Sequence, residues 1–355
     1  MERRLPTIEH SDTGSGGCGG VSRANPLEAR KTTRKRLPSW FRTTLPVGDS
    51  QIRFNGTKSK VKRHGLNTVC EEARCPNVHD CWGRGTATFM VAGEVCTRGC
   101  RFCAVGTVKT PPKLNPAEPV ELAGAIGKMG LSYAVITVVN RDDLGDGGAS
   151  HYRECIIEVN NQNPGVGLEL LCSDLDGNLD SLALLLEDLP LKVFAHNVEC
   201  VPRLDKVVRD RRASFHQSLV ILKQAKSLRP DILTKTSIMV GLGETDGEVE
   251  EALEMIREAG VDMVTIGQYL QPSYKHLPVD RFPEPERFAD WDRVAREIGF
   301  GAVASGPLVR SSYRAGMLWD EAMGGEPVVT RDSTGSAVSH LLHREGKITA
   351  RGQMP

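Results

Sequence analysis

Short apolar segments alternate with amphipathic segments through the middle of the chain. The apolar segments are five to nine residues long and mostly hold β-branched residues, as expected of strands buried on both faces. They cover residues 86–93, 133–139, 167–171, 191–197, 234–242 and 263–270. The segments between them have helical periodicity. One example is the i, i+3, i+4, i+7 stripe formed by Val249, Ala252, Leu253 and Ile256.

The order of these elements predicts a parallel sheet, because strand–helix units that follow one another form right-handed crossovers. A doubly wound sheet and a barrel both fit this order. Polar and glycine-rich segments follow the strands, and in a barrel they meet at the carboxyl-terminal face, where such enzymes keep their chemistry. We therefore expect an α/β fold, a partial (β/α)6 barrel of the TIM type with an N-terminal cysteine-rich extension.

The two ends of the chain lack this alternation. Residues 1–40 contain the low-complexity stretch SDTGSGGCGG and the charge run ARKTTRKR, which together predict a disordered tail. A mitochondrial transit peptide is the alternative, although four acidic residues in this segment are unusual for such a leader. We expect the extension at 41–84, the barrel at 85–320 and a poorly ordered tail at 321–355.

Composition narrows the class of protein. Hydrophobic residues make up 39% of the 355 residues and charged residues 25%, as in globular proteins. Lysine plus arginine and aspartate plus glutamate each number 45, and this balance is unlike the basic excess of nucleic-acid binders. There is neither an apolar run of about 20 residues nor a signal peptide core. We expect a cytoplasmic protein with no nucleic-acid or membrane partner.

Cysteine placement points to the chemistry. Six of the ten cysteines lie between Cys70 and Cys103. A secreted domain would use them as disulfides, and a cytosolic protein as thiolate ligands or redox groups. Disulfide-rich chains are usually short and poor in core, whereas this chain is long and rich in strand patterns. Metal ligation in a reducing compartment is therefore the favoured interpretation.

The segment CTRGCRFC holds Cys96, Cys100 and Cys103 with C-x3-C-x2-C spacing. This spacing lets three thiolates converge from one tight loop, in which Gly99 permits the turn. Thiolates suit zinc or an iron–sulfur cluster. A structural zinc site has four protein ligands, whereas three ligands leave one iron of a cluster open.

With Phe102 as its aromatic residue, this motif resembles the signature of the radical S-adenosylmethionine superfamily. The resemblance implies a 4Fe–4S cluster whose open iron chelates the methionine end of S-adenosylmethionine, with Phe102 close to the cofactor. It also implies that Asn197, at the end of a predicted strand, contacts the ribose, and that Thr137 contacts the cofactor from the second strand.

A second group, Cys70, Cys75 and Cys81, precedes it with C-x4-C-x5-C spacing. His79 lies inside this group and could complete a zinc site. The two triplets together with RSSYRAG at 310–316 resemble the lipoyl synthase family over residues 40–320. The resemblance implies a second 4Fe–4S cluster on the first triplet with Ser312 as its fourth ligand. Ser311 is the alternative ligand, and a helix N-cap is the alternative role for either serine.

The resemblance also implies a reaction. Two sulfur atoms would be inserted at C6 and C8 of an octanoyl chain held on a lipoyl carrier domain, either of a 2-oxoacid dehydrogenase or of the glycine cleavage H protein. Further expected partners are an electron donor such as ferredoxin or flavodoxin and an iron–sulfur carrier. No catalytic acid or base is expected, because radical abstraction needs none. The alternative is another sulfur-inserting enzyme, such as an RNA methylthiotransferase.

Overall fold

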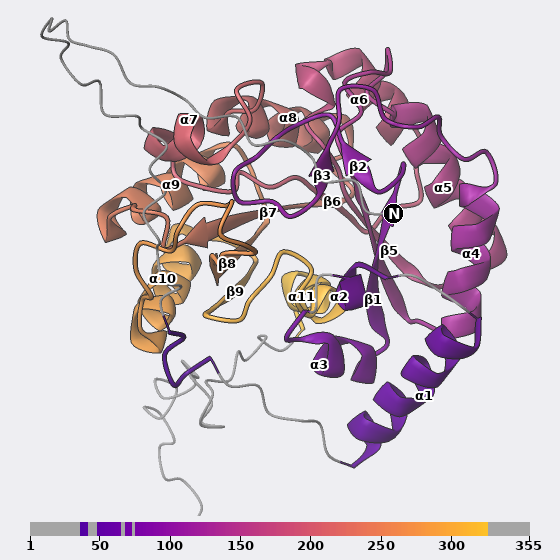
Figure 1. The fold of residues 1–355 in the computed structure, drawn as a ribbon, viewed down its shortest axis with the longest axis horizontal. Coiled ribbons are helices and arrows are strands. Elements are labelled where there is room, and N and C mark those ends of the chain that lie inside the picture. Colours follow the sequence, from indigo (N-terminus) through magenta and orange to yellow (C-terminus); the bar gives the residue numbers. More distant parts are fainter. Residues whose placement is uncertain (1–35, 42–47, 65–67, 73–74, 326–355) are drawn as a thin grey trace, which may run out of the picture. The chain divides into compact units, whose positions relative to one another are not determined.

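The structure is a computed structural model that describes residues 36–41, 48–64, 68–72 and 75–325. Within these residues the main sheet has seven strands in the order β1-β4-β5-β6-β7-β8-β9, and every neighbouring pair is parallel (Figure 1). The strands are β1 (Thr86–Val91), β4 (Tyr133–Val138), β5 (Gly167–Leu171), β6 (Val193–Ala195), β7 (Leu233–Val240), β8 (Met263–Gln268) and β9 (Ala302–Gly306).

The predicted partial barrel is confirmed, because the strands follow sequence order and the described residues show no pairing between β1 and β9. All six predicted strands are present. The sequence did not predict β9, whose five residues, AVASG, are mostly small and carry a single β-branched side chain. It also missed the pair formed by β2 (Val95–Cys96) and β3 (Gly106–Thr107), which are only two residues long.

Six helices cover the outer face of the sheet (Figure 1). In α9 a capping box formed by Thr245 and Glu248 fixes the first turn, and the predicted apolar stripe is fully buried. The six are α4 (Glu118–Met129), α5 (Ala149–Gln162), α6 (Leu179–Leu186), α8 (Phe215–Leu228), α9 (Asp246–Glu258) and α10 (Pro285–Ile298).

The last helix, α11 (Ala315–Ala322), lies on the inner face of the sheet, which the sequence pattern did not predict. Leu318 on this helix is fully buried and joins an apolar cluster with residues of β6, β8 and β9. Gly316 packs against Tyr133 at the start of β4. Because α11 fills the amino-terminal end of the barrel, the chain that leads into it must pass through the interior.

The N-terminal extension covers β1, an edge strand of the sheet. It contains α1 (Asp49–His64), α2 (Val69–Glu72) and α3 (Val78–Gly83), of which α2 and α3 contact β1. Phe54 of α1 packs against Trp82 of α3, and both side chains are buried. A covered edge is protected from pairing with other chains. The expected tails at 1–40 and 321–355 lie largely outside the described residues, and α11 continues to Ala322.

The remaining described helices are short and lie in the loops at the carboxyl ends of the strands. They are the 3-10 turns η1 (Leu175–Gly177) and η2 (Pro202–Leu204) and the single-turn helix α7 (Asp205–Val208). These loops hold much of the polar chemistry, in accordance with the arrangement expected for a barrel.

Candidate functional site

A cavity of about 280 Å³ opens at the carboxyl ends of β4, β5 and β6, and we call it the carboxyl-edge cavity. Every residue that the sequence assigned to the second triplet and to cofactor contact lines it. These residues are Cys96, Cys100, Cys103, Phe102, Thr137 and Asn197. They come from three parts of the chain, and the fold brings them together around one space large enough for a ligand.

The loop that carries the second triplet is clamped by one arginine. Arg98 lies between Cys96 and Cys100, and its side chain is only 2% exposed. Its Nη2 donates to Asp142 at 2.7 Å and its Nη1 to Asp174 at 2.7 Å. Burial opposes the charge, but the hydrogen bonds and charges of these carboxylates raise the pKa of Arg98. The loop is thereby tied to the segments that follow β4 and β5.

The thiols of this loop sit in a mostly buried setting. Burial raises the pKa of Cys100 to about 11, and burial also raises the pKa of Cys103. Backbone N–H groups already point at the sulfurs: that of Asp210 donates to Cys100 Sγ, and that of Arg98 donates to Cys96 Sγ, each at 3.3 Å. Such donors favour the thiolate, which is the form that binds metal.

Asn197 has a neighbour that the sequence did not single out. Its Nδ2 donates to Glu199 Oε1 at 3.2 Å, and Glu199 also lines the carboxyl-edge cavity. Burial raises the pKa of Glu199. Its position after a buried strand, two residues beyond an already chosen asparagine, was the signal that could have identified it. An amide and a carboxyl side by side can recognise neighbouring hydroxyl groups on a ligand.

The first triplet lies within the N-terminal extension, with Cys70 on α2 and Cys81 on α3, the two helices that contact β1. Cys70 accepts hydrogen bonds from Thr88, and Cys81 accepts one from the backbone N–H of Arg314. Burial is the largest cause that raises the pKa of Cys70 and brings the pKa of Cys81 to about 12, and the charge of Cys75 raises both further. Cys75 therefore lies close enough to both other thiols for their charges to interact.

The RSSY segment returns to this triplet. Thr88 Oγ1 donates to Ser312 Oγ at 3.0 Å, and the partly buried Arg310 lies close enough to Cys75 for their charges to interact. Asn77 Nδ2 donates to the carbonyl of Leu308 at 2.6 Å, and this bond ties the segment before RSSY to the N-terminal extension. Neither serine caps α11, whose N-cap is Arg314 without a side-chain hydrogen bond. The contact with Thr88 favours Ser312 over Ser311 as the fourth ligand.

The spacing of the donors distinguishes a cluster from a single ion. Zinc binds sulfur at about 2.3 Å, so its ligands lie less than about 4 Å apart. Among the described residues, only Glu118, His151 and Cys155 form a set of three donor atoms within 4.8 Å of one another, and that set belongs to neither triplet. His79 instead packs on Phe54, with ring centroids 4.3 Å apart. Within the described residues neither triplet therefore has the close spacing that a single zinc ion requires, which leaves the larger 4Fe–4S cluster as the group expected in each place.

A family model of the radical SAM superfamily matches residues 90–267, which include the second triplet and most of the sheet. Among solved structures, the FeFe-hydrogenase maturase HydG from Carboxydothermus hydrogenoformans matches with a TM-score of 0.51 at 14% identity. The match covers 78% of this chain and 62% of that one. The fold and the site therefore define a member of the radical SAM superfamily.

Similarity to known proteins also identifies the family within this superfamily. A model of the N-terminal domain of lipoyl synthase matches residues 22–75. The mitochondrial lipoyl synthase of Xenopus laevis is 48% identical over 82% of this chain and 78% of its own length, and that of Yarrowia lipolytica is 47% identical over 86% and 88%. The chain belongs to the lipoyl synthase family, so the RNA methylthiotransferase alternative falls away. Membership implies S-adenosylmethionine and two 4Fe–4S clusters.

The state of the cysteines and the location of the protein were also predicted from the sequence. The nine cysteines in the described residues are all free, which agrees with metal ligation rather than disulfides. No helix in the described part of the chain is long and apolar enough to cross a membrane. The names of the relatives are mitochondrial, so they count against the cytoplasmic location that the sequence suggested.

Proposed function

We propose that this protein inserts two sulfur atoms at C6 and C8 of an octanoyl group carried on a lipoyl domain. The observation that supports this most directly is the pair of cysteine triplets, one around the carboxyl-edge cavity and one against β1, the second approached by Ser312. Radical abstraction requires one site and sulfur donation another, and the two triplets are proposed to supply them.

The second triplet is proposed to hold the cluster for radical abstraction at the carboxyl-edge cavity. Its ligands are Cys96, Cys100 and Cys103. When bound, this cluster supplies the electron that splits S-adenosylmethionine into methionine and a hydrogen-abstracting 5′-deoxyadenosyl radical. Three further residues that line the same cavity as the thiols are proposed to position S-adenosylmethionine. They are Phe102, Thr137 and Asn197. Glu199 beside Asn197 would add a second acceptor for ribose hydroxyls.

The sulfur atoms are proposed to come from a cluster held by Cys70, Cys75, Cys81 and Ser312. Atom balance supports a protein-bound source, because the sulfur of S-adenosylmethionine leaves with methionine. A serine oxygen is a harder and weaker ligand for iron than a thiolate, so it suits a cluster that is taken apart. The hydrogen bond from Thr88 would hold Ser312 in place as the other ligands exchange.

The acyl chain is proposed to reach the carboxyl-edge cavity, whose walls include many apolar side chains. Such walls suit an eight-carbon chain. Val69, the neighbour of Cys70, is one of them, so the cavity extends toward the first triplet. The other apolar side chains in its lining are Met90, Phe102, Val105, Val138, Val139, Leu171 and Ala213.

We also propose the partners that this reaction requires. They are octanoylated carrier domains of 2-oxoacid dehydrogenases or of the glycine cleavage H protein, a ferredoxin or flavodoxin as electron donor, and an iron–sulfur carrier. The names of the relatives favour a mitochondrial location, which imaging of a C-terminally tagged chain in its own cells would test. A cytosolic signal would contradict it.

A direct assay tests the proposed function. Anaerobically reconstituted protein is incubated with dithionite, S-adenosylmethionine and an octanoylated carrier domain, and the carrier is weighed by mass spectrometry. Its mass should rise by two sulfur atoms, with release of two 5′-deoxyadenosines for each product. Octanoylated carrier without S-adenosylmethionine is the control. Release of 5′-deoxyadenosine with no sulfur on the carrier would contradict the proposal.

A further inference from the structure

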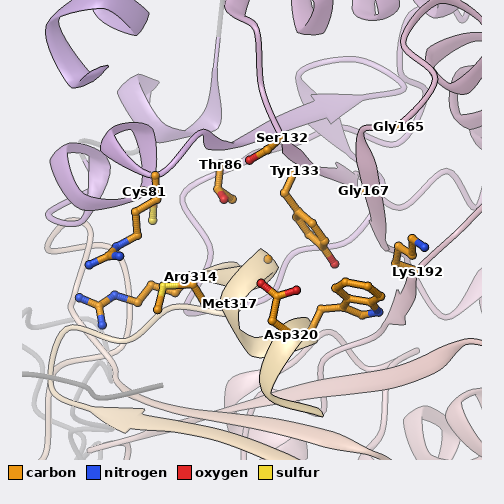
Figure 2. A pocket seen from close by; sticks show the side chains of 13 residues that line it. Cys81, Thr86, Ser132, Tyr133, Gly165, Gly167, Lys192, Arg314, Met317 and Asp320 are labelled. Atoms are coloured by element: carbon orange, nitrogen blue, oxygen red, sulfur yellow. The ribbon is translucent and has the colours of Figure 1, made fainter. Parts of the chain in front are cut away.

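A second cavity, of about 390 Å³, lies at the opposite end of the sheet. Thr86, Tyr133 and Gly167 line it, and each is the first residue of its strand, so we call it the amino-edge cavity. Helix α11 forms its floor. Figure 2 shows Cys81 and Arg314 on one side, Lys192 on the other, and Tyr133 and Asp320 between them. Its volume falls within the range of about 300–1,000 Å³ that is typical of ligand pockets.

The amino-edge cavity joins solvent to the first triplet. Arg84, Ser132 and Lys192 in its lining are exposed, whereas Cys81 and Arg314 are at most 8% exposed. Cys81 is the only cysteine that lines it in the described residues. The carboxyl-edge cavity reaches all three cysteines of the second triplet, so the two triplets are approached from different ends of the barrel.

The charge of the amino-edge cavity favours an anion. Arg84 and Arg314 share one carboxylate, Asp80, at 2.8 and 2.7 Å. Lys192 Nζ lies over the Trp319 ring, 4.9 Å from its centroid, and within the described residues it forms no ion pair. With Asp320 the balance is three cations against two carboxylates, a net charge of +1. These charged groups make it a poorer site for an eight-carbon chain than the more apolar carboxyl-edge cavity.

The reaction needs such an access route. Each lipoyl product removes two sulfur atoms from the protein, so sulfur must be supplied again before the next product forms. The carboxyl-edge cavity is used by S-adenosylmethionine and the acyl chain. We propose, on the basis of the proposed function, that the amino-edge cavity admits an anionic, thiolate-ligated iron–sulfur cluster to Cys81 and so reloads the first triplet.

The transfer is a ligand exchange in which no atom changes oxidation state. The sulfur of Cys81 forms a bond to one iron, a donor thiolate leaves that iron, and the proton of Cys81 passes to the departing thiolate. Cys70 and Cys75 then exchange in the same way at two further irons. Lys192 attracts the anionic cluster to the mouth of the cavity, and Asp320 opposes it.

The rate of loading tests this route without turnover. The background is Cys96→Ala/Cys100→Ala/Cys103→Ala, in which only the first triplet can hold a cluster. The probe is a synthetic 4Fe–4S cluster with four 2-mercaptoethanol thiolates, and the readout is iron bound per chain against time, with the visible absorbance of the cluster. Lys192→Glu should slow loading roughly threefold or more, and Asp320→Asn should accelerate it.

The matched control is Lys223→Glu, the same charge change at an exposed lysine of α8. It should load at the background rate. The differences should shrink at about 1 M salt, where charges are screened within about 3 Å. Equal loading rates in all four proteins would overturn the access route and leave the proposed function standing. If Lys192→Glu leaves the loading rate unchanged and, placed alone in the wild-type protein, raises the KM for octanoylated carrier, the cavity belongs to the carrier and the access route is overturned.

Two outcomes separate the route from the proposed function. If no cluster forms in any of the four proteins, the first triplet is not a cluster site and both proposals fail. If the rate differences are found but the wild-type protein adds no sulfur to its carrier, the sulfur-insertion role is overturned and the access route is supported.

Discussion

Thr88 Oγ1 lies 3.0 Å from Ser312 Oγ, although 224 residues separate the two in the chain. Thr88 is in the middle of β1 and also donates to Cys70, so it connects the serine to the first triplet. The contact exists because the chain leaves β9 at the carboxyl end of the sheet and descends through the barrel into α11. A serine in a surface loop could not be held so firmly beside this triplet, of which Cys70 and Cys81 are buried.

Ser312 is therefore expected to matter for sulfur transfer more than for cluster assembly. Ser312→Ala should retain most of its iron, because three thiolates remain, but should form less than about one tenth of the lipoyl product. Ser312→Cys should keep its iron at least as well and also insert sulfur poorly, since a thiolate binds iron more firmly. Iron analysis and carrier mass spectrometry on the same preparations measure both effects.

Ser311→Ala is the matched control, and it should stay close to wild-type activity. The result that would sink the assignment is full activity in Ser312→Ala together with loss in Ser311→Ala. Thr88→Val provides a second check, because it keeps the shape of the side chain and removes the hydroxyl that orients Ser312. We expect a partial loss of product in that variant.

Substitutions in the two triplets should abolish different steps of the reaction. Cys100→Ala should abolish reductive cleavage of S-adenosylmethionine, because the cluster at the carboxyl-edge cavity loses a ligand. Cys75→Ala should still release 5′-deoxyadenosine but add no sulfur to the carrier. Anaerobic assays of 5′-deoxyadenosine and of carrier mass distinguish the two steps. Lipoyl product from Cys75→Ala would show that the first triplet does not supply the sulfur.

Arg98 is expected to be the main structural clamp of the second triplet. Arg98→Gln leaves Asp142 and Asp174 without their buried cation, and losing one partner of such a pair typically costs about 3–5 kcal/mol. The free energy of unfolding, measured anaerobically in urea, should fall by about that amount. Arg212→Gln is the control: its guanidinium is 37% exposed and also pairs with Asp142, so the cost should be about 1 kcal/mol or less. Equal costs would contradict the clamp.

Local patterns predicted most of the fold. The six strands and the stripe of α9 were recognisable because burial on both faces of a sheet requires continuous apolar runs and burial of one helix face requires period 3.6. The cysteine spacing likewise predicted both triplets. Strand β9 was not recognisable, because its small residues leave room for α11 and so lack a strand's usual side chains.

What could not be predicted depends on contacts between distant segments. The role of Arg98 depends on two carboxylates more than forty residues away, and nothing in CTRGCRFC shows them. The amino-edge cavity is formed by the first residues of three strands together with α11, so no single motif marks it. Ser312 was identified through a family resemblance, because a serine followed by a helix more often indicates a cap.

His196 should make the fold sensitive to mild acid. Its side chain is buried, with Nδ1 2.9 Å from the carbonyl of Cys172 and Nε2 2.9 Å from Ser218 Oγ. Burial lowers the pKa of His196 to about 4. The unfolded chain, with a pKa near 6.5, therefore binds a proton that the folded protein does not. Stability is full above pH 6.5 and declines as the pH falls toward 4.

The size of this loss of stability follows from the same difference in pKa between the folded and unfolded chain. Between pH 6.5 and 5.5 this histidine should lower the free energy of unfolding by about 1 kcal/mol. His196→Asn keeps a polar side chain of similar reach but cannot titrate, so its stability should vary less with pH over this interval. Other groups titrate in both proteins, so the difference between the two urea-denaturation curves isolates His196. Identical pH dependence in the two proteins would mean that folding leaves the pKa of His196 unchanged, and burial would then not hold its ring neutral.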